Sequence, residues 1–240
     1  MKFSIIIPTL NEEKTIQSCL LALQPLRNDC GLIIVDGDST DNTRRLAAPL
    51  ADKVILSAKG RAKQMNNGAK QATGEILMFL HADTCLPENA LALIQEKISL
   101  TRQWGHFDIQ LSGNLFLLKV IAQMMNWRSR LTGIATGDQV IFVTRQAFEK
   151  AGQYPEINLM EDIALCKKLK KISLPICLKD KVISSGRRWE QNGIYRTLLL
   201  MWTLRLRYFF GADPKTLAFL YTQSVFTQFK LSDLCKRRCR

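Results

Sequence analysis

Four short apolar runs alternate with amphipathic stretches over the first hundred residues, and this alternation constrains the fold more than any other feature. The runs are "FSIII" (3–7), "LIIV" (32–35), "KVILS" (53–57) and "ILMFL" (76–80). Continuous runs of Ile, Leu and Val are typical of strands that are covered on both faces. Strands that alternate with helices at this spacing predict an α/β sheet with parallel neighbours and right-handed crossovers.

The helices of this half are predicted from cap and breaker residues. One helix is expected to begin near Glu12, with Thr9 or Asn11 as its cap, and a second after residues 36–38, with Ser39 or Thr40 as its cap. A third is expected in "RAKQMNNGAKQA" (61–72), and a fourth from Pro87.

Beyond residue 100 the pattern is looser. Strands are expected at 139–144 and 181–185, and helices at 114–127, at 160–172 and from Gly193 onward. The apolar stretch 114–127 is expected to be a core helix more readily than a lipid groove. The stretch 194–210 mixes aromatic residues with arginines, which suits either a helix in a membrane interface or a core-packed helix with outward arginines.

Each of the four predicted strands ends in polar residues. These are 9–12 (Thr-Leu-Asn-Glu), 36–38 (Asp-Gly-Asp), 59–61 (Lys-Gly-Arg) and 81–83 (His-Ala-Asp). Ligands of such sheets gather at the carboxyl ends of the strands, so these distant segments are expected to converge on one site.

The residue types at these strand ends favour a bound nucleotide. A carboxylate at the end of a buried strand, such as Asp83, needs a cation, and hard divalent cations share oxygen ligands with phosphates. Asp36 is placed to accept hydrogen bonds from a base or ribose, and Arg61 offers a planar donor group for phosphate. The chain has no G-x-G-x-x-G after its first strand and no Walker sequence, which disfavours a dehydrogenase or a P-loop enzyme.

Positive charge is concentrated in the second half of the chain. Residues 1–120 hold 13 Lys/Arg and 12 Asp/Glu, a net charge of +1, whereas residues 121–240 hold 21 and 9, a net charge of +12. This asymmetry predicts contact with a phosphorylated molecule, a nucleic acid or an acidic membrane, or else only a solubilising surface. Nucleic acid is disfavoured because aromatic residues are not interleaved with the basic ones on a recognisable fold.

Composition and cysteine use indicate an ordinary globular protein of a reducing compartment. Apolar residues make up 47% and charged residues 23% of the 240. The seven cysteines are an odd number without a framework, which predicts free thiols and a cytoplasmic location. A zinc site at Cys235 and Cys239 is disfavoured because the chain has only two histidines. The N-terminus does not resemble a signal peptide, and no segment is expected to span a bilayer.

Six motifs in order then carry a family resemblance over residues 5–165. They are "IIIPTLNEE", "VDGDSTDNT", "GRAKQMNNGA", "FLHADT", "GDQVIFVTRQAFEKAGQYP" and "MEDIAL". Together they resemble an inverting family 2 glycosyltransferase of the GT-A fold. More narrowly, they are similar to a bacterial transferase-2-like subgroup to which a role in arsenosugar biosynthesis has been attached.

The resemblance implies a fold and a division of the chain. It implies a GT-A nucleotide-diphospho-sugar transferase fold, α/β, with a mostly parallel mixed central sheet flanked by helices. The GT-A domain is expected at 1–190, with a nucleotide-binding half at 1–100 and an acceptor half at 101–190. A helical, basic C-terminal extension is expected at 191–240.

The resemblance also implies roles for nine residues. Thr9, Glu12 and Asp36 are expected to hold the nucleoside. Arg61 is expected near the base or phosphates. His81 and Asp83 occupy the D-x-D position, with Asp83 as ligand for Mg²⁺ or Mn²⁺ on the donor diphosphate. Asp162 matches the general base, with Glu161 as its nearest rival. Arg188 and Trp189 match the end of a Q-x-x-R-W element that holds acceptor or diphosphate.

Two positions depart from the family pattern. His81 stands where many relatives carry Asp, which leaves one carboxylate and the diphosphate to hold the metal, and the histidine to orient a phosphate or a metal-bound water. Ser185 stands at the Gln of Q-x-x-R-W, which favours single addition over processive synthesis.

The function expected from the sequence is metal-dependent, inverting transfer of a sugar from a UDP- or GDP-sugar to an acceptor hydroxyl. The acceptor is unknown and lipid-linked acceptors are included; peripheral contact with an anionic membrane at its inner face is compatible with this function. The alternatives are a sugar-phosphate nucleotidyltransferase, which needs a glycine- and arginine-rich loop after its first strand, and a non-catalytic basic module that binds membrane or nucleic acid.

Overall fold

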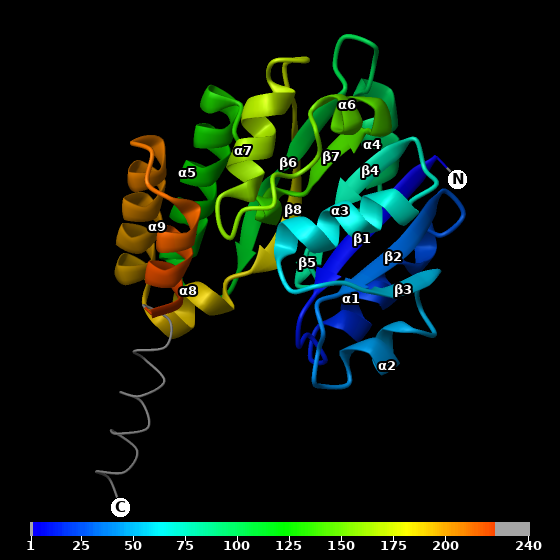
Figure 1. The fold of residues 1–240 in the computed structure, drawn as a ribbon, viewed down its shortest axis with the longest axis horizontal. Helices are drawn as coiled ribbons and strands as arrows, with labels where there is room; N and C mark the ends of the chain where they lie inside the picture. The colour runs from blue at the N-terminus through cyan, green and yellow to red at the C-terminus, as the bar shows by residue number, and fades with distance from the viewer. Residues whose placement is uncertain (1, 224–240) are drawn as a thin grey trace, which may run out of the picture. The chain divides into compact units, whose positions relative to one another are not determined.

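The computed structural model describes residues 2–223, and in this part of the chain eight strands form one mixed sheet (Figure 1). The strands are β1 (Phe3–Thr9), β2 (Cys30–Asp36), β3 (Lys53–Leu56), β4 (Ile76–Phe79), β5 (Thr84–Cys85), β6 (Trp104–Ser112), β7 (Ile141–Thr144) and β8 (Ile176–Ser185). Their order across the sheet is β3-β2-β1-β4-β7-β6-β8-β5.

The described part of the chain also contains helices. They are α1 (Ile16–Leu23), α2 (Thr43–Ala47), α3 (Arg61–Gln71), α4 (Ala90–Lys97), α5 (Phe116–Thr132), α6 (Arg145–Lys150), α7 (Glu161–Leu169), α8 (Arg187–Asn192) and α9 (Ile194–Phe209), with short 3₁₀ turns η1 (Gln24–Leu26) and η2 (Gly137–Gln139). Helix α3 packs against β1 and β2, and α5 packs against β6. Residues 214–223 are helical as well.

The predicted parallel half of the sheet is confirmed. Strand β1 pairs with β2 and with β4, and β2 pairs with β3, all in parallel. The register places Thr9 beside Asp36 and Asp36 beside Leu56. The carboxyl ends of these strands therefore lie at one edge of the sheet, as their apolar runs and polar ends predicted.

The sheet reverses direction beyond β4. Strand β7 runs antiparallel to both β4 and β6, and its Ile141 pairs with Phe79 of β4. The segment that leads into β7, η2, consequently lies next to the end of β4. This reversal brings residues 137–139 to the strand ends of the parallel half.

Strand β6 is a central strand that the sequence pattern did not reveal. It carries a buried histidine and a buried aspartate, which interrupt the apolar run that marks other central strands. His106 Nδ1 lies 3.0 Å from Phe107 O and its Nε2 lies 3.4 Å from Cys177 Sγ. Asp108 forms an ion pair with Arg130 of α5. Both polar side chains are therefore satisfied within the core, and His106 has a structural role.

Two predicted helix starts are wrong. The first helix begins at Ile16 and the second at Thr43, after Asn42. Neither Ser39 nor Thr40 caps the second helix. The Ser39 amide and hydroxyl donate hydrogen bonds to Asp36 instead, so the polar residues expected to cap this helix shape the loop that follows β2.

The chain divides into two compact units, which are described separately. The first comprises residues 1–156 and 161–185 and contains the sheet. The second comprises residues 157–160 and 186–240, of which the structure describes those up to 223. The cysteine pair 235 and 239, for which zinc binding was disfavoured, lies outside the described residues, as does the end of the predicted basic extension.

Helix α5 has one buried face and one exposed face. Leu118 and Ile121 are buried, whereas Phe116, Trp127 and Leu131 are exposed. The expectation of a core helix at 114–127 therefore holds for one face only. Within residues 2–223, none of the helices has the length and apolar character needed to cross a membrane.

Candidate active site

Thr9 and Asp36 lie side by side at the ends of β1 and β2. The Thr9 hydroxyl donates to Asp36 Oδ2 at 3.2 Å. The Ser39 amide donates to Oδ1 at 2.8 Å and the Ser39 hydroxyl to Oδ2 at 2.6 Å. Asp36 is fully buried, and Arg44 Nε lies 3.7 Å from its Oδ1. Asp36 therefore organises the loop after β2, and its contact with a nucleoside stays a prediction.

Gln64 joins these strand ends to helix α3. Its buried side-chain amide donates to the carbonyls of Thr9 and Val35, each at 2.8 Å. A Cβ on Gly37 would lie 3.0 Å from Gln64 Nε2, so the loop passes too close for a larger residue. Gln64 was not singled out from the sequence, because its partners are backbone atoms 55 and 29 residues away.

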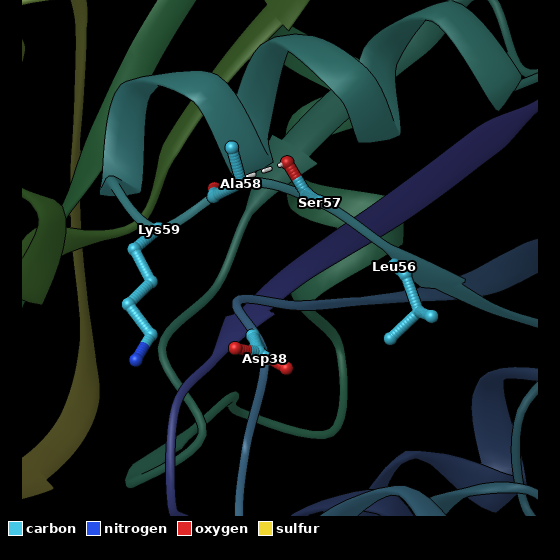
Figure 2. A pocket seen from close by; sticks show the side chains of 5 residues that line it. All are labelled: Asp38, Leu56, Ser57, Ala58 and Lys59. Carbon is cyan, nitrogen blue, oxygen red and sulfur yellow. Dashed lines mark hydrogen bonds between the residues drawn. The ribbon is translucent and has the colours of Figure 1, made fainter.

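An open pocket of about 630 Å³ lies beside these loops (Figure 2). It is lined by Asp38, Leu56, Ser57, Ala58 and Lys59, which come from the segments that follow β2 and β3. Asp38 adopts a positive φ of 69°, a conformation that turns the chain sharply after β2. An exposed carboxylate and an exposed ammonium thus border a pocket at the carboxyl edge of the parallel strands.

Glu12 lies in the turn between β1 and α1. Its carboxylate accepts a hydrogen bond from the Thr15 hydroxyl at 2.7 Å, and its amide donates to the Thr43 hydroxyl at 2.8 Å. These bonds fix the loop after β1 against the start of α2. The predicted role of Glu12 at the nucleoside stays a prediction.

Arg61 and Glu161 connect the starts of two helices. Arg61 is the first residue of α3 and Glu161 the first residue of α7. Arg61 Nη1 lies 3.6 Å from Glu161 Oε1; the arginine is partly exposed and the glutamate is buried. Glu161, the rival candidate for the general base, is therefore engaged with a cation.

His81, Gly137 and Asp162 meet at the end of β4. A Cβ on Gly137 would lie 2.4 Å from His81 Nε2 and 3.1 Å from Asp162 Oδ2. The imidazole and the carboxylate therefore both lie against this glycine. His81 Nδ1 lies 3.1 Å from Asp138 Oδ1, so the turn η2 also holds the other side of the ring. Neither Gly137 nor Asp138 was singled out from the sequence, because only the antiparallel register of β7 reveals the contact.

Asp162 combines burial with an incomplete set of hydrogen bonds. The Gly137 amide donates to its Oδ2 at 2.8 Å, while its buried Oδ1 has no hydrogen-bond partner among the described residues. Burial, followed by the negative charge of Glu161, raises the pKa of Asp162 from 3.8 to about 6. The positive charges of Arg61 and His81 act in the opposite direction. A carboxyl group of this kind can exchange a proton near neutral pH.

Tyr154 is buried next to this cluster. Its ring packs against Phe79 and Phe148, with centroids 4.9 and 5.8 Å away. Its backbone N–H donates a hydrogen bond to Asn66 Oδ1 at 3.0 Å. Burial, and next the charge of Asp162, raise the pKa of Tyr154. The Tyr154 hydroxyl has no hydrogen-bond partner in the described part of the chain.

Tyr154→Phe is expected to raise the free energy of unfolding by about 1 kcal/mol, because it removes a buried hydroxyl that forms no hydrogen bond. Denaturant unfolding would measure the change. Tyr195→Phe, at an exposed tyrosine of α9, is the matched control and is expected to change nothing. A loss of stability in Tyr154→Phe would show instead that the hydroxyl has a bonded partner, such as a buried water.

Asp83 lies in the turn between β4 and β5. Its carboxylate is half-buried and makes no hydrogen bond or ion pair with any of residues 2–223. Among the same residues, no group of three His, Cys, Asp or Glu side chains could hold a metal ion by itself. The predicted role of Asp83 as a ligand for Mg²⁺ or Mn²⁺ stays a prediction.

Arg188 and Trp189 belong to the second unit, in α8. Arg188 is exposed, and its guanidinium carbon lies 5.6 Å from the centroid of the Tyr221 ring. Their predicted contact with acceptor or diphosphate therefore stays a prediction.

Comparison with known proteins relates the first half of the chain to one family. Residues 4–113 match the family described as Glycosyl transferase family 2. A PGL/p-HBAD biosynthesis glycosyltransferase of Mycobacterium tuberculosis is 43% identical over 96 residues, which cover 36% of this chain and 37% of that protein. Residues 4–113 thus resemble a family 2 glycosyltransferase, and the match to this relative spans little more than a third of its length.

Solved structures show the same fold. Staphylococcus aureus TarS 1-349 in complex with UDP has a TM-score of 0.63 at 22% identity, over 77% of this chain and 60% of that one. The mannosyltransferase PcManGT of Pyrobaculum calidifontis, in complex with GDP-Man and Mn²⁺, has a TM-score of 0.58 at 22% identity, over 76% and 56%. These likenesses confirm the predicted GT-A fold. None of the proteins named here concerns arsenosugars, and the narrower subgroup is not supported.

Proposed function

We propose that this protein transfers a single sugar, with inversion, from a nucleotide-diphosphate sugar to an acceptor hydroxyl. The observation that carries the proposal concerns Asp162, a buried carboxyl group with a raised pKa. It lies against Gly137 and close to His81, at the edge of the sheet where the strands end in polar residues. Relatives of the same fold are described in complex with UDP and with GDP-Man, which supports a UDP- or GDP-sugar as donor.

The proposed step is a direct displacement at the anomeric carbon. Asp162 accepts the proton of the acceptor hydroxyl while its oxygen forms the new bond to that carbon. The bond between the carbon and the diphosphate breaks on the opposite face, and the electron pair leaves with the diphosphate. A base with a pKa of about 6 is largely ionised at neutral pH and therefore ready to accept this proton.

The donor is proposed to bind along the carboxyl edge of the parallel strands. Thr9, Glu12 and Asp36 would face the nucleoside, and Arg61 the base or phosphates. His81 would orient a phosphate or a metal-bound water. Arg188 and Trp189 are proposed to contact the acceptor or the diphosphate.

Asp83 is proposed to hold Mg²⁺ or Mn²⁺, the latter being present in the PcManGT complex. When bound with the diphosphate, such a cation offsets the negative charge of the leaving group. The available carboxylate of Asp83 supports this assignment, and the partly exposed Arg61 offers a second positive group at the same edge of the sheet.

The partners we propose are the nucleotide-sugar donor and an acceptor hydroxyl, free or lipid-linked, but no nucleic acid. We propose a cytoplasmic location with peripheral contact at an anionic membrane. Residues 1–100 would form the donor half, 101–190 the acceptor half, and 191–240 the basic extension.

Donor nucleotide is expected to protect the protein against thermal unfolding only when Mn²⁺ or Mg²⁺ is present. At about 100 times Kd the melting temperature should rise by roughly 5–10 °C. A scanning screen of UDP-, GDP- and dTDP-sugars would identify the base. Asp83→Ala should abolish the thermal protection that depends on the metal. Asp29→Ala, at an exposed aspartate, is the control and should keep this protection. Equal protection without metal, or in Asp83→Ala, would contradict the metal assignment.

A further inference from the structure

Helix α9 carries a continuous apolar stripe that faces solvent. Tyr195, Leu199, Trp202, Leu206 and Phe209 follow one another at steps of four and three residues, which places them on one side of a helix. Each of them is between 59% and 75% exposed. Single exposed apolar residues are ordinary on protein surfaces, but five in one row form a patch of the kind that marks an interaction site.

The opposite side of α9 is already packed. Thr197 and Leu204 are buried, at 5% and 1% exposure. At about 100° of rotation per residue, these two positions lie roughly opposite the centre of the stripe. Among the described residues, α9 therefore packs in its own unit through the face opposite the stripe, and the stripe is left exposed.

Arginines border the stripe on both sides. Arg196 and Arg207 lie about 100° from its centre on one side, and Arg205 lies at a similar angle on the other. Arg196 and Arg207 are exposed, and Arg205 is half-buried. Long cationic side chains at the edges of an apolar helix face can reach the headgroups of a membrane while the apolar residues enter its surface layer.

We infer that the α9 stripe docks on an anionic bilayer surface, with its apolar side chains in the headgroup region and its arginines on the lipid phosphates. A second copy of this chain fits less well, because two such faces would bring like charges together. Tyr and Trp in the row suit the membrane interface, and the net charge of +12 on residues 121–240 suits an anionic surface. The inference builds on the membrane contact in the proposed function and assigns it to one face of α9. Membrane binding can nevertheless be measured separately, because it does not depend on sugar transfer.

The expected effects are separable into apolar and electrostatic parts. Removing one buried Leu or Trp from the interface should weaken binding by about tenfold or more. Replacing one arginine should weaken it by about fivefold, with the effect fading at high salt. Binding to an uncharged bilayer should be weaker than to an anionic one.

The test is co-sedimentation of the full chain with vesicles of phosphatidylcholine containing roughly one third phosphatidylglycerol, compared with phosphatidylcholine alone. Trp202→Glu and Leu206→Glu should each reduce binding, and Leu100→Glu, at a 90% exposed leucine outside α9, should not. Arg207→Gln should reduce binding to anionic vesicles only, with Lys150→Gln as its control. Circular dichroism and melting temperature would verify that each variant is folded.

The result expected is salt-sensitive binding to anionic vesicles that the stripe variants lose. Three results would overturn the inference: no binding to any vesicle, binding that Trp202→Glu and Leu206→Glu leave unchanged, or a dimer that these variants convert to monomer. Asp162→Asn should retain vesicle binding. If it retains both binding and sugar transfer, the proposed catalytic role fails while the membrane inference stands.

Discussion

Asp162→Asn is expected to lower the rate of sugar transfer by about 10²–10⁴ and to leave donor nucleotide binding intact. The amide keeps the size of the carboxyl and can still accept the Gly137 hydrogen bond, but it cannot take a proton. Turnover would be measured as nucleoside diphosphate released, and binding as thermal protection. Glu149→Gln, at an exposed residue of α6, is the control.

Transfer by Asp162→Asn within tenfold of the unaltered chain would assign the base elsewhere. Glu161 would then be examined first, because it lies next in the chain. Its ion pair with Arg61 makes it the weaker candidate, since an engaged carboxylate is a poorer proton acceptor.

The raised pKa of Asp162 predicts how activity and stability vary with pH. Below about pH 6 the carboxyl is protonated, so transfer should fall about tenfold per pH unit. The folded-state pKa lies above the ordinary value of 3.8, so the folded protein holds this proton more tightly than the unfolded chain. The free energy of unfolding should therefore decrease as the pH rises from about 4 to about 6. Asp162→Asn should lack this decrease, which denaturant titration at several pH values would measure.

Gly137→Ala is expected to lower transfer by about 10², because it displaces two groups of the site at once. The new Cβ would lie 2.4 Å from His81 Nε2 and 3.1 Å from Asp162 Oδ2, so the ring must move. A displacement of the order of 1 Å at a reacting group costs about 10² in rate. Steady-state kinetics would measure the loss, and the melting temperature would verify the fold.

A double-mutant cycle distinguishes steric displacement from general disruption. His81→Ala removes the imidazole ring and with it the clash with a Cβ at residue 137. Adding Gly137→Ala to His81→Ala should therefore have little further effect on stability or on nucleotide protection. Additive losses of stability in the double variant would contradict the steric explanation. Gly152→Ala is an unsuitable control, because its φ of +72° strains any side chain.

The parallel half of the sheet was predictable because each of its strands is marked by a short pattern of neighbouring residues in the sequence. Each apolar run forms a strand that ends where polar residues begin. Strands β1, β2 and β4 are buried as expected, whereas β3 lies at the edge of the sheet and is exposed or half-buried. Strand β6 was not predictable in this way. His106 contacts Cys177, 71 residues away, and Asp108 forms an ion pair with Arg130, 22 residues away.

The candidate site likewise contains residues that were predicted from the sequence and residues that were not. Thr9, Asp36 and His81 were predicted because they follow apolar runs directly. Gln64 and Asp138 were not, because their contribution depends on backbone positions and strand register. A glutamine in a helix rich in small residues is weak evidence for a functional site, because polar residues that face the core of a protein have many structural roles. For Tyr154, the sequence offered no signal apart from an aromatic residue before a proline.

The reversal of direction between β4 and β7 has a consequence for how such a site can change. The strands that end in Thr9 and Asp36 and the turn at residues 137–139 come from separate segments of the chain, so each can accept substitutions independently. A three-residue replacement of the same length at that turn would alter the surroundings of His81 and Asp162 and leave the neighbouring strands in place. This turn can therefore change in sequence while β1, β2 and β4 keep their register.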